Sequence, residues 1–397
     1  MQTHSPRNFL WLALKVGGVV LLLLVLLLGG LIAYFVTEKR KYERLTDTRD
    51  LRLRAAKIGE GYVGARKDAA LVIGVTQRGQ RAVLGFGRVA PTNSVLPDAR
   101  TMFEVGSVTK VFTALALARL ELDGKLKLTD TLREVLPEKV ALAKSIEAVT
   151  LMHLATHTAG LPRLPSNLDA SAANLANPYA KYRTEDLQQY LAGAKVNNPA
   201  GALMDYSNVG FAVLGQALST KAGQSYEALL RSSVLDPLGL TDTVIQLSPD
   251  QRTRLTPGHS PKGEVVPGWD FDAFAPAGAL QSNAADLLTF IEANLADADT
   301  SVGRILARAR QLHKVGEAGE LPLGWQRQQD FQTGLEICWH NGGTGGYASM
   351  IAFCRKPQLG VVVLSNHGDV MAGKFEVDKI GLELLKLASK VSLEREP

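Results

Sequence analysis

FEVGSVTKVFTALALARL, residues 103–120, predicts a helix that is buried inside a large domain. From Val108 to Leu120 the sequence is apolar on almost every side, which is typical of an interior helix. Lys110 lies in the first turn, where the positive end of the helix dipole and the apolar neighbours both disfavour a cation. Ser107 precedes Lys110 by three residues, so the two side chains share one face of the helix. The sequence thus places a serine and an unfavourably positioned lysine side by side at the start of a buried helix.

The pair has two interpretations. In the structural one, Ser107 caps the helix and the Lys110 chain reaches water. In the functional one, apolar burial lowers the Lys110 pKa until its amine can take the Ser107 proton and make the serine a nucleophile. The N–H groups at the start of the helix then offer partners to an oxyanion. The sequence contains one S-x-x-K.

Two further stretches carry polar side chains next to apolar elements. DYSNVG, residues 205–210, places Tyr206 and Asn208 before an apolar helix, where they are either cap and packing residues or a proton shuttle and a substrate-holding amide. WHNGGTGGYASMIAFC, residues 339–354, places His340 and Asn341 before four glycines. This stretch is either a glycine-rich hairpin or a strand edge that lacks side chains, so that a substrate can lie along its backbone.

The three stretches in this order resemble the serine β-lactamase and penicillin-binding family. S-V-T-K, then Y-S-N about 100 residues later, then H-N-G, is similar to the branch of class C β-lactamases and D-alanyl-D-alanine carboxypeptidases. The resemblance covers roughly residues 68–385 and includes HLATHTAGLP and AGALQSNAADLLTF. It implies a serine hydrolase that works through an acyl-enzyme without a cofactor.

The resemblance also implies roles for the catalytic residues. Ser107 is the acylated nucleophile, and Lys110 is its base or proton relay. Tyr206 serves the leaving group and deacylation. Whether Lys110 or Tyr206 is the general base stays open, because the two groups can titrate as a unit.

The binding roles follow from the second and third motifs. By resemblance, substrate contacts come from Asn208, His340, Asn341 and Gly342, and the oxyanion hole comes from the N–H groups of Ser107 and Gly343. His340 stands where typical class C β-lactamases have lysine, and Asn341 stands where a hydroxyl residue is common. These departures favour a peptidase or esterase over an efficient resistance enzyme.

Composition excludes several other classes. The 397 residues are 46% hydrophobic and carry a net charge of +5, but residues 68–397 alone hold 32 basic and 34 acidic side chains. Nucleic acid is therefore not an expected partner of the main domain. Two cysteines exclude a disulfide scaffold, and His153 with His157 lacks the glutamate of H-E-x-x-H, so no metal is expected.

Residues 16–36, VGGVVLLLLVLLLGGLIAYFV, contain no charge and are long enough to span a bilayer. The alternative is a cleaved signal peptide, but the run is too long for one and no clean A-x-A site follows. We expect a short tail at 1–15, a membrane anchor at 16–36 and a charged stalk at 37–67. The positive-inside rule favours a cytoplasmic domain, whereas the family's cell-wall substrates favour the periplasmic side of a bacterial inner membrane, which we prefer.

The main domain is predicted over residues 68–390. Strand-like runs at 70–89 and again after residue 320 enclose a mainly helical region at about 125–275. This order predicts an α/β (α+β) fold in which both chain ends build one antiparallel sheet flanked by helices. If the strands around the glycine hairpin pair about residue 346, Cys338 and Cys354 face each other and form a cross-strand disulfide.

The sequence supports three functions. The first is a membrane-anchored serine hydrolase acting on D-amino-acid peptides or amides of the cell wall or on β-lactams. The second is a carboxylesterase of the same fold, and the third is a penicillin-binding-like module without turnover. The intact set of Ser107, Lys110 and Tyr206 argues against the third.

Overall fold

The computed structural model describes residues 26–37, 51–90, 92, 94–169, 176–296 and 299–390. The chain separates into two compact units, Met1–Arg49 and Asp50–Pro397. In the first unit, residues 26–37 form a helix. Across the described residues, no helix combines the length and the apolar character needed to cross a membrane. The predicted tail and residues 16–25 of the predicted span lie outside the described residues.

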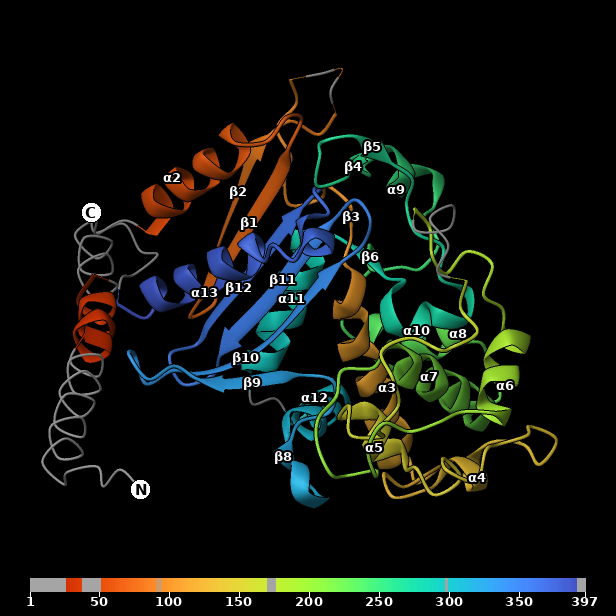
Figure 1. Cartoon of the computed structure of the whole chain (residues 1–397). Helices are drawn as coiled ribbons and strands as arrows, with labels where there is room; N and C mark the ends of the chain where they lie inside the picture. The colour runs from red at the N-terminus through yellow and green to blue at the C-terminus, as the bar shows by residue number, and fades with distance from the viewer. Residues whose placement is uncertain are drawn as a thin grey trace, which may run out of the picture. The chain divides into compact units, whose positions relative to one another are not determined.

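The second unit is built on a six-stranded antiparallel sheet in the order β2-β1-β12-β11-β10-β9 (Figure 1). Its strands are β1 (Ala70–Gln77), β2 (Gln80–Gly87), β9 (Gln326–Gln329), β10 (Glu336–Gly343), β11 (Ala348–Cys354) and β12 (Leu359–Ser365). β1 pairs with β12, so the two ends of the domain meet in the middle of the sheet. The predicted antiparallel sheet from both chain ends is confirmed.

Helices cover both faces of this sheet. α11 (Ala284–Leu295) packs on one face, where Gly74 of β1 and Gly360 of β12 leave room for Leu288 and Ile291. α13 (Glu376–Ala388) packs on the other, where its Gly381 lies against Met350. In Figure 1, α13 lies in front of the sheet and α11 behind it. Strands buried on both faces explain the unbroken apolar runs of β11 and β12.

Part of the predicted stalk belongs to the folded domain. Residues 51–64 form α2 (Leu51–Gly64), which packs on β1 and β2 and buries Leu51, Ala55 and Tyr62. The Tyr62 hydroxyl lies 2.9 Å from Ser365 Oγ on β12. Arg52, Lys57 and Glu60 of this segment are exposed, whereas Arg54 is largely buried and pairs with Glu383 of α13, so the charges by themselves wrongly indicated a solvated stalk. Residues 38–50 of the predicted stalk lie outside the described residues.

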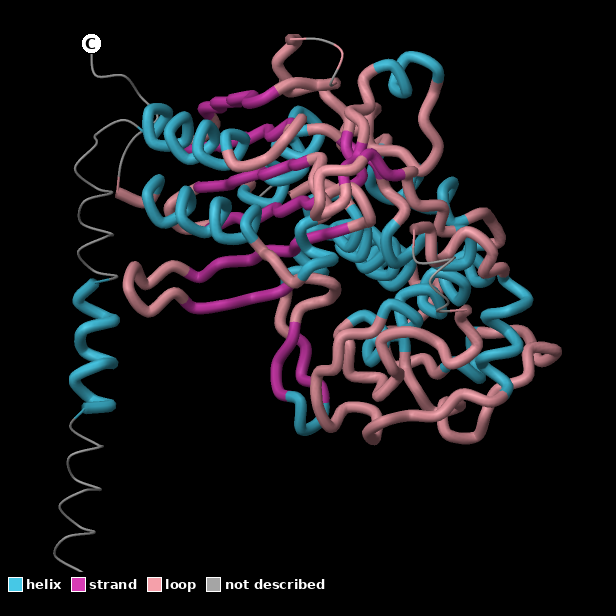
Figure 2. Tube along the Cα trace, turned by 45° about the horizontal axis from the view of Figure 1, so that its top comes forward, coloured by secondary structure: helices cyan, strands magenta, loops and turns pink. Residues whose placement is uncertain are grey.

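The helical region lies on one side of the sheet (Figure 2), and several of its helices pack against α3. α3 (Thr109–Leu122) follows the short 3₁₀ turn η1 (Gly106–Val108) and contacts α7, α10 and α12. The other helices are α4 (Leu132–Val135), α5 (Leu151–Ala155), α6 (Thr184–Ala192), α7 (Asn208–Ala222), α8 (Tyr226–Leu230), α9 (Pro249–Thr253), α10 (Ala275–Gly278) and α12 (Ser301–Arg310). Short ladders join β3 (Phe103–Glu104) with β6 (Gln281–Ser282), β4 (Gly258–His259) with β5 (Val265–Val266), and β7 (His313–Val315) with β8 (Gly319–Leu321).

α3 is the interior helix that the opening stretch predicts. All but three of its residues are buried, including Lys110. An all-round apolar surface suits this position, because neighbours surround the helix instead of covering one stripe.

The predicted disulfide is wrong. Cys338 and Cys354 are both free and buried. Cys338 of β10 stands opposite Phe353, one residue away from the register that would set it opposite Cys354. A shift of one residue turns a side chain to the other face of a sheet, so the two sulfurs lie on opposite faces.

Candidate active site

Ser107 lies in η1, just before α3 and against strand β10. Its side chain is partly exposed, whereas Val105, Gly106 and Val108 around it are buried. Gly106 has a φ of +50°, and a Cβ there would lie 2.7 Å from the Gly343 nitrogen. Only glycine allows this backbone conformation and this close approach without strain. The turn therefore presents Ser107 at the surface while its backbone stays pressed against the sheet.

Lys110 is fully buried one turn further along the chain. Its Nζ lies 3.0 Å from Ser107 Oγ and donates a hydrogen bond to the Ala277 carbonyl of α10 at 2.6 Å. Burial, and then the positive charge of Arg163, hold the Lys110 pKa well below its ordinary value. No described carboxylate forms an ion pair with this amine. A neutral lysine amine within hydrogen-bond distance of a serine hydroxyl can accept its proton.

Tyr206 lies against both members of this pair. Lys110 Nζ is 5.0 Å from the centre of the Tyr206 ring. Burial raises the Tyr206 pKa to about 12, and a hydrogen bond with Ser107 opposes the rise. The phenol thus stays protonated at neutral pH, in which form it can donate a proton but cannot act as a base by itself.

His340 and Asn341 occupy opposite faces of β10. The His340 ring lies 6.4 Å from the Tyr206 ring, on the side of the site. Asn341 instead donates a hydrogen bond from Nδ2 to Asp378 of α13 at 2.6 Å. Successive side chains alternate along a strand, so a residue next to His340 cannot face the same way. The structure does not bring the Asn341 side chain to Ser107.

His340 is neutral in this environment. Its burial and the neighbouring Lys110 lower its pKa to about 3. Its Nδ1 lies 2.6 Å from the Asn341 carbonyl, which can only accept, so Nδ1 carries the hydrogen and Nε2 carries the lone pair. His340 is therefore no substitute for the charge of a lysine in the third motif, and offers a hydrogen-bond acceptor instead.

Asn208 is the first residue of α7. Its Nδ2 donates to the Tyr179 hydroxyl at 3.1 Å, while its Oδ1 is buried without a described partner. The helix cap is Ser207, whose Oγ accepts from the Gly210 N–H at 2.9 Å. With capping assigned to Ser207, the Asn208 amide is available for a substrate.

The glycines of β10 bring the strand against the nucleophile. A Cβ on Gly342 would lie 2.0 Å from the Val105 carbonyl oxygen and 2.9 Å from the Ser107 nitrogen. A Cβ on Gly343 would lie 2.7 Å from Val370. Ser349 of the neighbouring strand β11 donates from Oγ to the same Val105 carbonyl at 2.8 Å. These contacts press the backbone of Gly342 and Gly343 against that of Val105 to Ser107, so the two N–H groups predicted to form an oxyanion hole belong to adjoining segments.

His157 is a site residue that the sequence did not single out for chemistry. Its ring stacks on Tyr206 with the centres 4.3 Å apart, and its Nδ1 accepts the Ser207 N–H at 3.1 Å. The ring is buried, and its pKa is held well below the ordinary value by desolvation and then by Lys110. His157 has a φ of +59°, an unusual conformation for a residue with a side chain. Its place in the conspicuous stretch HLATHTAGLP was the signal available.

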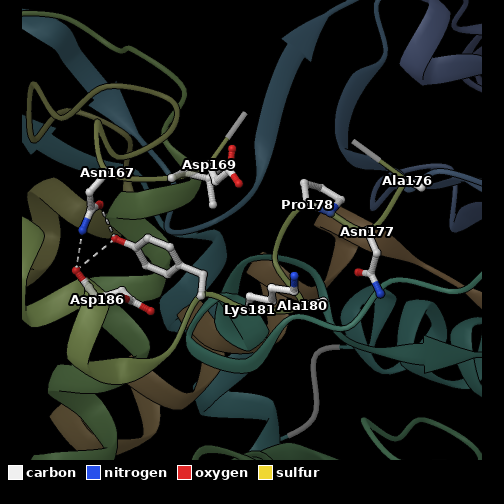
Figure 3. A pocket seen from close by; sticks show the side chains of 10 residues that line it. Asn167, Asp169, Ala176, Asn177, Pro178, Ala180, Lys181 and Asp186 are labelled. Carbon is white, nitrogen blue, oxygen red and sulfur yellow. Dashed lines mark hydrogen bonds between the residues drawn. The ribbon is translucent and has the colours of Figure 1, made fainter. Parts of the chain in front are cut away.

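A separate cavity of about 470 Å³ lies beside the segment before α6 (Figure 3). Tyr182 donates from its hydroxyl to Asn167 Oδ1 at 2.8 Å, and Asn167 Nδ2 donates to the Asp186 carbonyl at 2.9 Å. These groups satisfy one another, and the lining contains no nucleophile beside a base. Within the described part of the chain, no cluster of three His, Cys, Asp or Glu side chains could hold a metal.

A serine beside a buried lysine amine of lowered pKa, with a phenol against both and a glycine-lined strand nearby, defines a serine hydrolase. The chain belongs to the Beta-lactamase family, whose model matches residues 57–382.

Similar proteins agree with this assignment. The D-alanyl-D-alanine-carboxypeptidase/endopeptidase AmpH of Escherichia coli K12 is 29% identical over 303 residues, which are 72% of this chain and 76% of that protein. A β-lactamase of Lysobacter lactamgenus is 25% identical over 340 residues, 77% of this chain and 84% of that protein. A β-lactamase/D-alanine carboxypeptidase structure from Yersinia pestis superimposes with a TM-score of 0.69 at 25% identity, covering 85% of this chain and 99% of that one.

The buried amine predicts a pH-dependent stability difference for Lys110→Met. The unfolded chain holds the lysine proton up to a pH near 10.5, whereas the folded chain releases it at lower pH. The unfolded state then binds more protons, so wild-type stability rises with pH across this window. We expect the free energy of unfolding of Lys110→Met to exceed that of wild type by about 1–4 kcal/mol at pH 7. This difference between variant and wild type should shrink toward pH 10. Urea unfolding at both pH values measures it.

The matched control is Lys125→Met, which removes an exposed lysine just beyond the end of α3. The Lys125 side chain is in water in both the folded and the unfolded state. The free energy of unfolding of its variant should therefore differ from that of wild type by the same amount at pH 7 and pH 10. A Lys110→Met difference that is equally independent of pH would contradict a neutral Lys110 in the folded protein.

Proposed function

We propose that the protein hydrolyses acyl compounds through an acyl-enzyme on Ser107, with Lys110 and Tyr206 moving the protons. The observation that carries this is the 3.0 Å separation of Ser107 Oγ from the Nζ of a fully buried lysine. Burial makes the amine a base, and its position directs it at the one hydroxyl that can use it.

The reaction follows from these positions. Lys110 Nζ takes the proton of Ser107 as Oγ attacks the substrate carbonyl, and the N–H groups of Ser107 and Gly343 stabilise the oxyanion. Tyr206, protonated and beside both groups, passes a proton to the leaving group, and Lys110 restores it. Water then attacks the acyl-enzyme by the same route in reverse. Lys110 and Tyr206 act as one coupled unit, so a single general base need not be assigned.

The substrate class is D-amino-acid peptides or amides of the cell wall, and β-lactams as their analogues. The carboxypeptidase and β-lactamase relatives support this class. The neutral His340, and an Asn341 side chain directed to α13, favour peptide substrates over efficient β-lactam turnover. A carboxylesterase activity of the same site is the second candidate, because neither feature removes the acylation apparatus.

Intact mass of the purified full-length protein tests the acyl-enzyme. After incubation with a penicillin, we expect a Ser107-dependent mass increase equal to the penicillin, and with a fluorophosphonate an increase equal to the phosphonyl group. Ser107→Ala should show neither. Because the buried amine activates the serine, Lys110→Met should slow both additions by at least about 100-fold.

The outcomes separate the candidate functions. A penicillin adduct supports the peptidase assignment, and its lifetime measures turnover. Fluorophosphonate labelling without a penicillin adduct favours the esterase. If neither reagent adds to wild type, the acyl-enzyme proposal fails and a binding module without turnover becomes the better account.

We place the domain on the periplasmic side of a bacterial inner membrane, anchored by residues 16–36. The support is the uncharged run of 21 residues and a cell-wall substrate class, set against the basic residues that follow the run. Alkaline phosphatase fused to the C-terminus should be active in Escherichia coli. An inactive phosphatase, together with a fluorescent protein that is bright at the same position, would instead put the domain in the cytoplasm.

A further inference from the structure

We propose that Arg163 binds a carboxylate of the substrate and makes the enzyme selective for anionic acyl compounds. This inference rests on the proposed acyl-enzyme function and names its substrate class more closely.

The backbone of Arg163 is fixed at the edge of the site. Its carbonyl accepts the N–H groups of Asn208 at 3.0 Å and Val209 at 3.4 Å, at the start of α7. The preceding carbonyl, of Pro162, accepts a hydrogen bond from Ser207 Oγ at 2.7 Å. Three bonds therefore hold this segment beside the residues that flank Tyr206, so the origin of the Arg163 side chain is set by the fold.

The Arg163 side chain extends toward the catalytic groups. Its Cζ lies 5.1 Å from the centre of the Tyr206 ring, a distance at which a guanidinium is attracted to an aromatic face. The residue is exposed, and no described carboxylate forms an ion pair with it. Other arginines of the domain, such as Arg254 and Arg308, are held by carboxylates. Among the described residues, none takes the Arg163 donors in an ion pair, so they can meet a ligand.

Arg163 is also an exposed positive charge beside the site. Lys110 and His340 are buried away from solvent, and burial lowers the pKa of each, that of His340 to about 3. His157 is buried and its pKa is lowered in the same way. A guanidinium keeps its charge at every physiological pH. The cation offered to an incoming substrate is therefore Arg163, beside Tyr206. The His340 side chain of strand β10 does not supply it.

A carboxylate suits this cation. The planar fork of an arginine matches the two oxygens of a carboxylate, and such bonds are stronger than neutral ones. A carboxylate can lie on either side of the scissile bond, in the acyl group or in the leaving group. The position of Arg163 over the Tyr206 ring is compatible with a carboxylate in the acyl group or in the leaving group. The experiment therefore tests substrates of both kinds.

Two pairs of substrates test the inference. The acyl side is tested with the 4-nitrophenyl monoester of glutaric acid against 4-nitrophenyl butyrate. The leaving-group side is tested with a depsipeptide ending in D-lactate against its methyl ester. The quantity compared is the ratio of kcat/KM for the anionic member to kcat/KM for the neutral member, which cancels any general effect on Ser107.

We expect Arg163→Gln to lower this ratio by about tenfold or more in at least one pair, the loss expected on removing a hydrogen bond to a charged group. Arg163→Lys, which keeps the charge without the fork, should restore part of the ratio. Arg78→Gln, which removes an exposed arginine from the turn between β1 and β2, is the matched control and should leave the ratio as in wild type.

An equal loss for both members of each pair would overturn the inference, because it would mean that Arg163 acts only by lowering the Tyr206 pKa. Failure of the acyl-enzyme proposal is distinguishable, since no substrate would then be turned over in a Ser107-dependent way. In that case, equilibrium binding of the depsipeptide and its methyl ester to Ser107→Ala decides the inference. Tighter binding of the carboxylate that Arg163→Gln abolishes supports it, and equal binding contradicts it.

Discussion

The site depends on one constraint, a fully buried lysine amine beside a serine, with which no carboxylate of the described residues forms an ion pair. Burying Lys110 costs free energy that the fold must recover elsewhere, and α3 recovers it by packing apolar side chains on every side. The Ala277 carbonyl of α10 fixes the amine from behind, at 2.6 Å. Burial thus lowers the pKa of the amine while a hydrogen bond orients it, and a base for Ser107 requires both. Poor placement for stability is what makes the residue reactive.

The sheet completes the site from the other side. β10 approaches the turn before Ser107 so closely that glycine is required at Gly342 and Gly343. β10 pairs with β11, β11 pairs with β12, and β12 pairs with β1 from the start of the domain. The two backbone segments that we propose as the oxyanion hole are thus brought together by the sheet.

Much of this could be predicted from the sequence, because it depends on local patterns. The interior helix, the S-x-x-K pair and the apolar helix α7 that follows Tyr206 can each be predicted from a short stretch of sequence. What failed depends on register and on packing partners. The predicted disulfide misplaced β10 against β11 by one residue, and Asn341 belongs to the face of β10 opposite His340. His157 and Arg163 both contact Tyr206, which is distant in sequence, so the stretch HLATHTAGLP could draw attention to them without showing what they touch.

The most direct test of the central claim is the ionisation of Lys110 itself. NMR of protein labelled with ¹⁵N at lysine Nζ, compared with Lys110→Met to assign the signal, reports the charge of the amine at each pH. The account predicts a Lys110 signal that is that of a neutral amine at pH 8 and becomes charged only on acidification. A Lys110 amine that is still charged at pH 8 and titrates near 10.5 would contradict it.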